Sequence, residues 1–132
     1  VRSSEKPDDD FDWARTGDRA GIALKNIDAE ELDRGDVLAS DEALKSDSTL
    51  SARAELIRYW PAPLKEGMVL HLGHWMQFIP ARVTSVEAGE DWRKPLIGIE
   101  LDKPLVYRPG GRAVICQLEG SKLRIAGTLE LP

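Results

Sequence analysis

From Leu50 onward, hydrophobic and polar residues alternate in long stretches, with the period of two that strands with one buried face require. Prolines and glycines separate these stretches, as turns demand. Helical periodicity is almost absent. The pattern therefore predicts an all-β fold, a small six-stranded antiparallel β-barrel whose closure leaves no sheet edge exposed. The expected strands cover residues 50–56, 68–72, 78–86, 96–101, 113–118 and 123–131.

The first part of the chain has a weaker pattern. Residues 5–12 are acidic, contain a proline and predict a solvated loop. The sequence Thr16-Gly17-Asp18 predicts a turn, and residues 20–24 predict a short strand after it.

A short helix is expected next. Asp28 and Glu31 have the spacing of a capping box, and Gly35 supplies a stop, which limits the helix to two turns. Residues 36–39 then predict another strand. These few elements cannot bury a core alone. We expect them to pack against the later region or to complete a barrel whose other strands are missing.

A polar stretch at residues 41–49 lacks periodicity and is the best candidate for a linker. We therefore expect residues 1–40 and residues 50–132 to form separate regions, with the six-stranded barrel in the second. The chain begins at Val1 rather than at a methionine, which we interpret as a processed or trimmed chain, or a piece of a longer protein.

Composition narrows the function classes. The chain has 18 Lys and Arg against 23 Asp and Glu, a net charge of -5, which argues against nucleic-acid binding through bulk positive charge but not against a local basic face. No apolar run approaches the roughly 18 residues that cross a bilayer, and no secretory leader is visible. The single cysteine, Cys116, cannot form an internal disulfide, which fits a reducing cytoplasm.

Residues for catalysis or metal binding are scarce. His71 and His74 form an HxxH pair, but residues three apart on a strand face opposite sides unless Gly73 turns the chain, and no further ligand completes a site. Cys116 lies mid-strand, where a thiol is usually inert. Asp18 to Gly21 match the GTPase pattern D-x-x-G, yet no phosphate-binding loop G-x-x-x-x-G-K-[ST] stands upstream. We expect no metal, no cofactor and no catalytic activity.

Basic and aromatic residues fall together in two places. One is the stretch 73–78, and the other combines residues 91–94 with Tyr107-Arg108. Such pairs stack bases and contact phosphates in RNA-binding proteins. Trp75 and Trp92 are equally suited to closing the barrel ends or covering apolar surface.

A family resemblance is carried by two stretches. The first contains G-D-R-x-G-x-x-L, a short acidic turn and R-G-D-V-L, and resembles the end of the second domain of translational GTPases. The later stretch, with Gly-Gly-Arg-Ala-Val-Ile at 110–115 and Leu-Arg-Ile-Ala-Gly at 123–127, resembles their third domain, a six-stranded antiparallel barrel. Within that superfamily the archaeal selenocysteine-specific elongation factors and their paralogues are most similar. The matched residues of the first stretch are Gly17, Asp18, Arg19, Gly21, Leu24, Glu31, Leu32, Arg34, Gly35, Asp36, Val37 and Leu38.

For residues 1–40 the resemblance implies the last strands of the domain that holds the aminoacyl end of tRNA. Arg19 would line that pocket, and Gly17 and Asp18 would shape its turn. The alternative interpretation pairs Arg19 with the acidic residues Asp8 to Asp10.

For residues 50–132 the resemblance implies a barrel that grips the T-stem backbone of tRNA. Gln77, Arg124 and Gly127 are the candidate contacts, the glycine because it lets backbone approach a phosphate closely. Arg124 is equally compatible with a solvent-facing position, and Gly127 with a β-bulge.

The resemblance implies a non-catalytic, cytoplasmic part of a translation elongation factor that binds aminoacyl-tRNA. GTP would enter only through a GTPase domain, of the same or another chain, that these residues do not include, and neither membrane nor DNA is an expected partner. The alternative is a stand-alone protein-interaction barrel. In its favour, His71-Leu-Gly-His-Trp75 replaces the family's H-x-G-T-like segment, so that Trp75 becomes a candidate interface anchor.

Overall fold

The computed structural model describes all residues except 1–2, 7–8, 12, 41 and 120. It divides into two compact units, Val1–Asp33 and Arg34–Pro132, which are treated separately below. Among the described residues, no helix is long and apolar enough to cross a bilayer.

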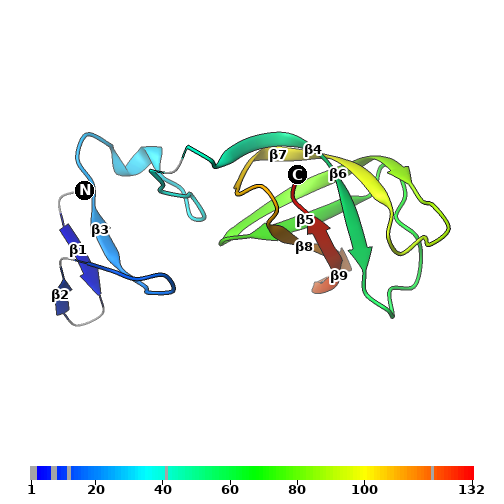
Figure 1. Ribbon diagram of the computed structural model, residues 1–132, viewed down its shortest axis with the longest axis horizontal. Helices are drawn as coiled ribbons and strands as arrows, with labels where there is room; N and C mark the ends of the chain where they lie inside the picture. The colour runs from blue at the N-terminus through cyan, green and yellow to red at the C-terminus, as the bar shows by residue number, and fades with distance from the viewer. Residues whose placement is uncertain (1–2, 7–8, 12, 41, 120) are drawn as a thin grey trace. The chain divides into compact units, whose positions relative to one another are not determined.

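The first unit contains a small antiparallel sheet in the order β2-β1-β3 (Figure 1). Its strands are β1 (Ser3–Lys6), β2 (Asp9–Phe11) and β3 (Gly21–Ala23). β3 lies within the strand predicted at 20–24. The prediction of a loop at 5–12 is wrong for its described residues, because β1 and β2 pair there as antiparallel strands, with Glu5 opposite Asp10 and Lys6 opposite Asp9.

The predicted helix shrinks to one turn of 3₁₀ helix, η1 (Ala29–Glu31). Asp28 takes the N-cap position with an extended backbone, but its side chain makes no capping hydrogen bond. Without the cap, so short a segment does not repay the cost of helix nucleation. The strand predicted at 36–39 is absent, and no described strand pairs with those residues.

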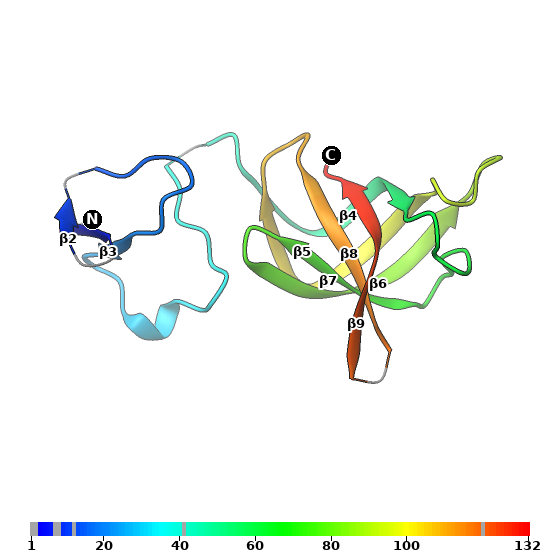
Figure 2. The ribbon, with the colours of Figure 1, turned by 90° about the horizontal axis from the view of Figure 1, so that it is seen from below.

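The second unit is a closed six-stranded barrel with the strand order β4-β7-β6-β5-β8-β9 (Figures 1 and 2). All neighbouring strands are antiparallel, and β9 closes the barrel against β4 through Leu56 and Gly127. The all-β prediction and its six strands are confirmed. The strands are β4 (Lys45–Leu56), β5 (Val69–His74), β6 (Gln77–Glu87), β7 (Leu96–Tyr107), β8 (Arg112–Glu119) and β9 (Lys122–Glu130).

Two strands extend further than the alternation indicated. β4 begins at Lys45, inside the predicted linker, and β7 continues past Leu101 to Tyr107. β7 includes Pro104, which the sequence suggested as a break. The register between β4 and β7 shifts near this proline, and prolines are tolerated at such irregularities because the ladder lacks a hydrogen bond there.

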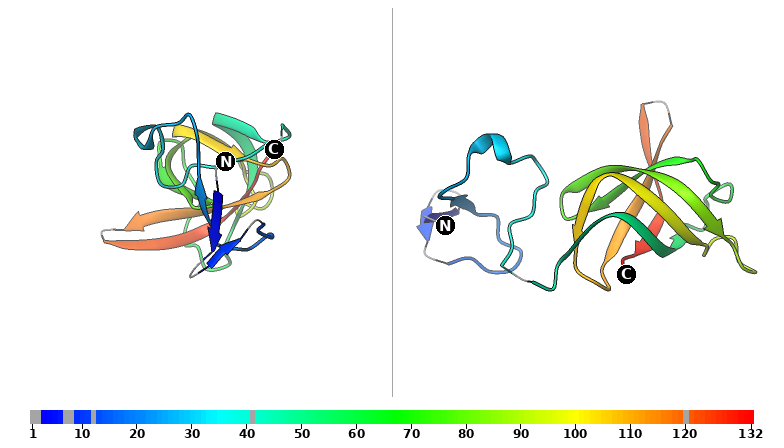
Figure 3. Two further views of the ribbon diagram at one scale, coloured as in Figure 1. Left: turned by 90° about the vertical axis from the view of Figure 1, so that its left-hand side faces the viewer. Right: turned by 90° about the horizontal axis from the view of Figure 1, so that it is seen from above.

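The core fills the barrel with the inward-facing residues of every strand. On β4 the residues Leu50, Ala52, Ala54 and Leu56 are at most 5% exposed, while the residues between them are exposed, as the alternation predicts. Figure 3 shows the far end of the β8–β9 hairpin projecting beyond the barrel wall.

Candidate nucleic-acid interface

One end of the barrel collects arginines that lie over aromatic rings. We call Arg58, Trp60, Trp92, Arg93 and Arg124 the arginine–tryptophan cluster. The guanidinium carbon of Arg93 is 4.1 Å from the Trp92 ring centroid, and that of Arg124 is 5.4 Å from the Trp60 ring centroid. At these distances a guanidinium is attracted by the π-face of the ring, which orients its charge.

The connections that leave β4 and enter β7 hold this cluster together. After β4 the chain turns tightly, with the Trp60 amide donating to the Ile57 carbonyl at 3.0 Å. Arg93 crosslinks that turn to the β6–β7 connection, because its Nη1 donates to the carbonyls of Ile57 and Trp60 at 3.0 Å each. The Asp91 carboxylate accepts from the Arg93 amide at 3.0 Å. The half-buried Arg93 is thus structural, whereas Arg58 and Arg124 are exposed.

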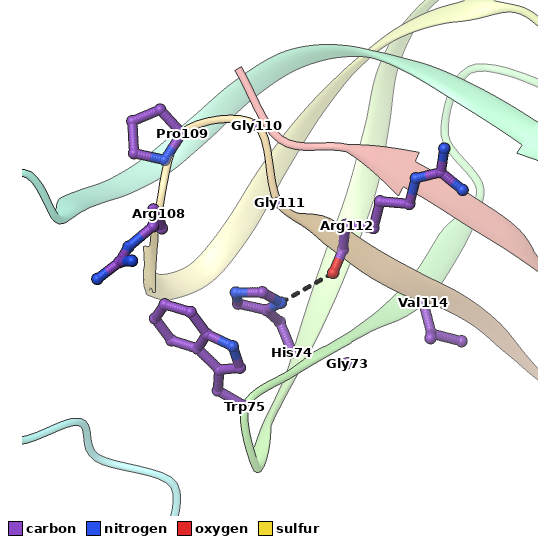
Figure 4. A pocket seen from close by; sticks show the side chains of 9 residues that line it. All are labelled: Gly73, His74, Trp75, Arg108, Pro109, Gly110, Gly111, Arg112 and Val114. Atoms are coloured by element: carbon purple, nitrogen blue, oxygen red, sulfur yellow. Dashed lines mark hydrogen bonds between the residues drawn. The ribbon is translucent and has the colours of Figure 1, made fainter. Parts of the chain in front are cut away.

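The opposite end of the barrel contains a hollow of about 620 Å³, which we call the Trp75 hollow (Figure 4). It lies between the β5–β6 turn and the β7–β8 turn. The His74 ring stacks on the Trp75 indole with 4.4 Å between centroids, and its Nδ1 donates to the Arg112 carbonyl at 2.9 Å. The lining residues are Gly73, His74, Trp75, Arg108, Pro109, Gly110, Gly111, Arg112 and Val114.

The grouping of basic and aromatic residues expected from the sequence is therefore wrong in one respect. Arg108 does not join residues 91–94 but lies beside Trp75, whereas Arg93 joins Trp60. The sequence interpretation also missed Arg58 and Trp60, although the run Arg58-Tyr59-Trp60 has the same aromatic-basic character as the stretches it singled out.

Gln77, a predicted tRNA contact, is buried with 6% of its surface exposed. Its Nε2 donates to the carbonyls of Val106 at 2.8 Å and His74 at 3.2 Å, and its Oε1 accepts from the Val106 amide at 2.9 Å. Both ends of the amide are thus satisfied by backbone. The side chain locks β6 to the end of β7 and presents no group to a ligand.

Arg124 and Gly127 both lie on β9. Arg124 is exposed and belongs to the arginine–tryptophan cluster. Gly127 is buried, and a Cβ there would collide with the Glu55 carbonyl oxygen and come within 2.8 Å of the Leu56 Cα. The close approach of β9 to β4 therefore requires a glycine at this position. The extra residue of the neighbouring irregularity in the β8–β9 register is Ala126.

The turn predicted at Thr16-Gly17-Asp18 is present in the first unit. Gly17 adopts φ +90°, a conformation that favours glycine. The Asp18 carboxylate accepts from the Arg15 amide at 2.9 Å and the Asp18 amide donates to the Arg15 carbonyl at 3.0 Å. Arg19 follows the turn and is exposed. Its alternative pairing with Asp8 to Asp10 lies outside what the structure describes.

The residues that the sequence offered as metal ligands are His71, His74 and Cys116. β5 runs through Gly73 without a break, so His71 and His74 face opposite sides, and His71 stacks on Phe78 with 4.9 Å between centroids. No cluster of three metal-ligating side chains is found within the described residues. Cys116 is buried on β8, and this burial raises the pKa of its thiol, which disfavours the reactive thiolate.

Comparison with known proteins shows which proteins the chain is similar to. No family model matches the chain. An uncharacterized protein of Methanocaldococcus jannaschii, MJ0325, is 33% identical over 132 residues, covering 99% of this chain and 40% of that protein. The selenocysteine-specific elongation factor of the same organism is 26% identical over 144 residues, covering 96% of this chain and 31% of that protein. The chain thus spans less than half the length of these relatives.

Solved structures agree on the fold. Translation elongation factor SelB from Methanococcus maripaludis in its apo form superimposes with a TM-score of 0.79 at 24% identity, covering 99% of this chain and 32% of SelB. The chain is a homologue of the SelB elongation factor. SelB in complex with the GTP analogue GppNHp gives a TM-score of 0.78. The expected resemblance is confirmed, and the match is to a β-barrel portion of SelB, about a third of its length.

Proposed function

We propose that this SelB-like chain is a non-catalytic part of a translation elongation factor and binds aminoacyl-tRNA in the cytoplasm. The homology to SelB supports a role in translation, and the chain carries no phosphate-binding loop motif of its own. In this proposal the barrel contacts the T-stem, and the first unit contacts the acceptor end through the turn at Gly17, Asp18 and Arg19.

The observation that carries the proposal is the arginine–tryptophan cluster. Arg58 and Arg124 are exposed, and Arg93 braces the turn that leads from Arg58 to Trp60. Guanidinium groups match phosphate oxygens in a planar, bidentate geometry, and their orientation on aromatic rings reduces the entropy lost on binding. In a protein of net charge -5, a local arrangement of this kind is what RNA backbone binding requires.

A labelled T-arm hairpin RNA titrated with the protein, over a series of salt concentrations, tests the proposal. We expect the Arg124→Ala variant to bind several-fold more weakly and to reduce the salt slope by about one, because one phosphate contact is removed. The matched control is Arg82→Ala, which removes an exposed positive charge from the middle of β6, outside the cluster. Equal losses in the two variants, or no binding by the wild type at low salt, would refute the proposal.

A further inference from the structure

We propose that the Trp75 hollow binds a nucleoside phosphate, with the base against the Trp75 indole and the phosphate on Arg108. This is a second ligand site, distinct from the T-stem contact proposed above. The ligand is either a free nucleotide or the same unit in an unpaired stretch of RNA.

The chemistry of the lining favours this ligand. Figure 4 shows the Arg108 side chain and the Trp75 indole on the same wall, with the His74 ring between them and the turn Gly110-Gly111. The Arg112 side chain points away from this wall, so Arg108 supplies the positive charge. None of the nine lining residues is acidic. A cation beside an aromatic face is the combination that binds a base and its phosphate together.

His74 adds a group that a ligand would satisfy. Because Nδ1 donates to the Arg112 carbonyl, the neutral ring carries its lone pair on Nε2. This Nε2 is shielded from solvent and has no hydrogen-bond partner among the described residues. An unpaired buried acceptor costs free energy, which a ligand hydroxyl or amino group would recover once the stacked Trp75 indole moves aside to admit it.

The backbone at the hollow is strained. Trp75 and Met76 are the two central residues of the β5–β6 turn, with φ of +47° and +65°. A two-residue turn with both φ values positive strongly prefers Asn-Gly, and large side chains there are unfavourable. Trp75 nevertheless remains 46% exposed and Met76 84% exposed. Strain that burial does not explain is typical of a functional position.

The hollow and the arginine–tryptophan cluster lie too far apart for one short contact. On the β8–β9 ladder Arg112 pairs with Glu130 at the hollow, whereas Gln117 pairs with Arg124 at the cluster. Five residues of strand separate the two positions, roughly 17 Å. A mononucleotide bound at one site therefore does not reach the other.

The test is titration of the whole chain with 5′-AMP, adenosine and inorganic phosphate at low ionic strength, followed by NMR of the Trp75 indole N–H. This signal is assigned by its loss in Trp75→Phe. We expect AMP to shift this signal saturably. AMP should also bind more tightly than adenosine or inorganic phosphate alone. Trp75→Ala and Arg108→Ala should each weaken AMP binding at least tenfold, and Arg82→Ala should leave it unchanged.

A second variant distinguishes a loss of AMP binding from a loss of folding. Replacing Trp75-Met76 by Asn-Gly supplies the residues that the turn prefers, so this variant should unfold at a higher temperature and yet lose AMP binding. An RNA tetranucleotide that binds more tightly than AMP identifies an RNA strand as the source of the ligand, and equal affinity identifies a free nucleotide.

Two results would overturn the inference: no saturable shift with AMP, or AMP binding that survives unchanged in both Trp75→Ala and Arg108→Ala. In the first case the exposed Trp75 is better explained as a protein contact. Neither result bears on the T-arm hairpin, whose binding we expect to depend on Arg124 and not on Trp75.

Discussion

The two ends of the barrel use arginine and tryptophan in opposite ways. In the arginine–tryptophan cluster, Arg93 is fixed by two backbone carbonyls and Trp60 is buried, so charges are held on a rigid surface. At the Trp75 hollow the tryptophan is exposed on a strained turn and lines an open volume. Rigid surface charge suits the phosphates of a helical RNA, whereas an open recess with one aromatic face suits a single planar group.

The largest expected effect is a loss of stability where β9 packs against β4, beneath the arginine–tryptophan cluster. Gly127→Ala places a Cβ against the backbone of Glu55 and Leu56, which cannot yield without separating β9 from β4. We expect a loss of about 3 kcal/mol or more in the free energy of unfolding, measured by urea denaturation. The control is Gly89→Ala, where a Cβ meets nothing within 4 Å, and a change within about 0.5 kcal/mol is expected. Equal stabilities of the two variants would show that β9 can move away from β4 far enough to admit the Cβ.

An intermediate loss of stability is expected for a substitution of Gln77, beneath the hollow. Gln77→Ala removes three hydrogen bonds and leaves the amide and carbonyl of Val106 without their side-chain partner. We expect a loss of about 2–3 kcal/mol. The control is Gln117→Ala, because that half-buried side chain makes no hydrogen bond within the described residues, and it should lose less than 1 kcal/mol, about the cost of an ordinary substitution. A Gln77→Ala variant as stable as this control would refute the locking role.

The smallest expected effect is a dependence of stability on pH. It arises at Tyr107, at the end of β7 that leads into the hollow. Tyr107 donates to the Asp47 carboxylate at 2.6 Å, and burial together with this carboxylate raises the pKa of Tyr107 from 10.0 to about 12. The folded state therefore holds the phenolic proton more tightly than the unfolded state. Its stabilising contribution is complete below pH 10 and disappears as the pH rises through 12.

Tyr107→Phe tests this linkage. The variant should lose about 1 kcal/mol at neutral pH, the typical value of a hydrogen bond. The difference in unfolding free energy between wild type and variant should then shrink between pH 10 and pH 12. Tyr59→Phe, at a residue that is 80% exposed, should show no such convergence. A wild-type advantage that persists unchanged above pH 12 would contradict the assignment.

The barrel could be predicted from the sequence because alternation is local: residues 50–56 alone reveal which side of β4 is buried. The hollow could not, because Arg108 meets Trp75 only through the strand order, in which β5 pairs with β8 and β6 with β7. The burial of Gln77 could not be predicted for a related reason, since a polar residue at a turn is expected to be exposed. Its burial depends on the Val106 backbone, 29 positions away.

Within residues 1–40 the turn at Gly17 and the strand β3 could be predicted. The helix and the strand at 36–39 could not, because segments so short carry too little local pattern. Asp28 and Glu31 satisfy the spacing of a capping box, yet only a single 3₁₀ turn forms. The division into regions at 1–40, 41–49 and 50–132 and the acceptor-end role of Arg19 remain predictions.

The most direct measurement is NMR shift mapping on one sample, first with the T-arm hairpin RNA and then with 5′-AMP. The account predicts that the hairpin perturbs signals of Arg58 and Arg124, and that AMP perturbs those of His74, Trp75 and Arg108. Shifts by both ligands at the same end, or a hairpin that perturbs only the hollow, would contradict the claim that the two ends of the barrel bind different ligands.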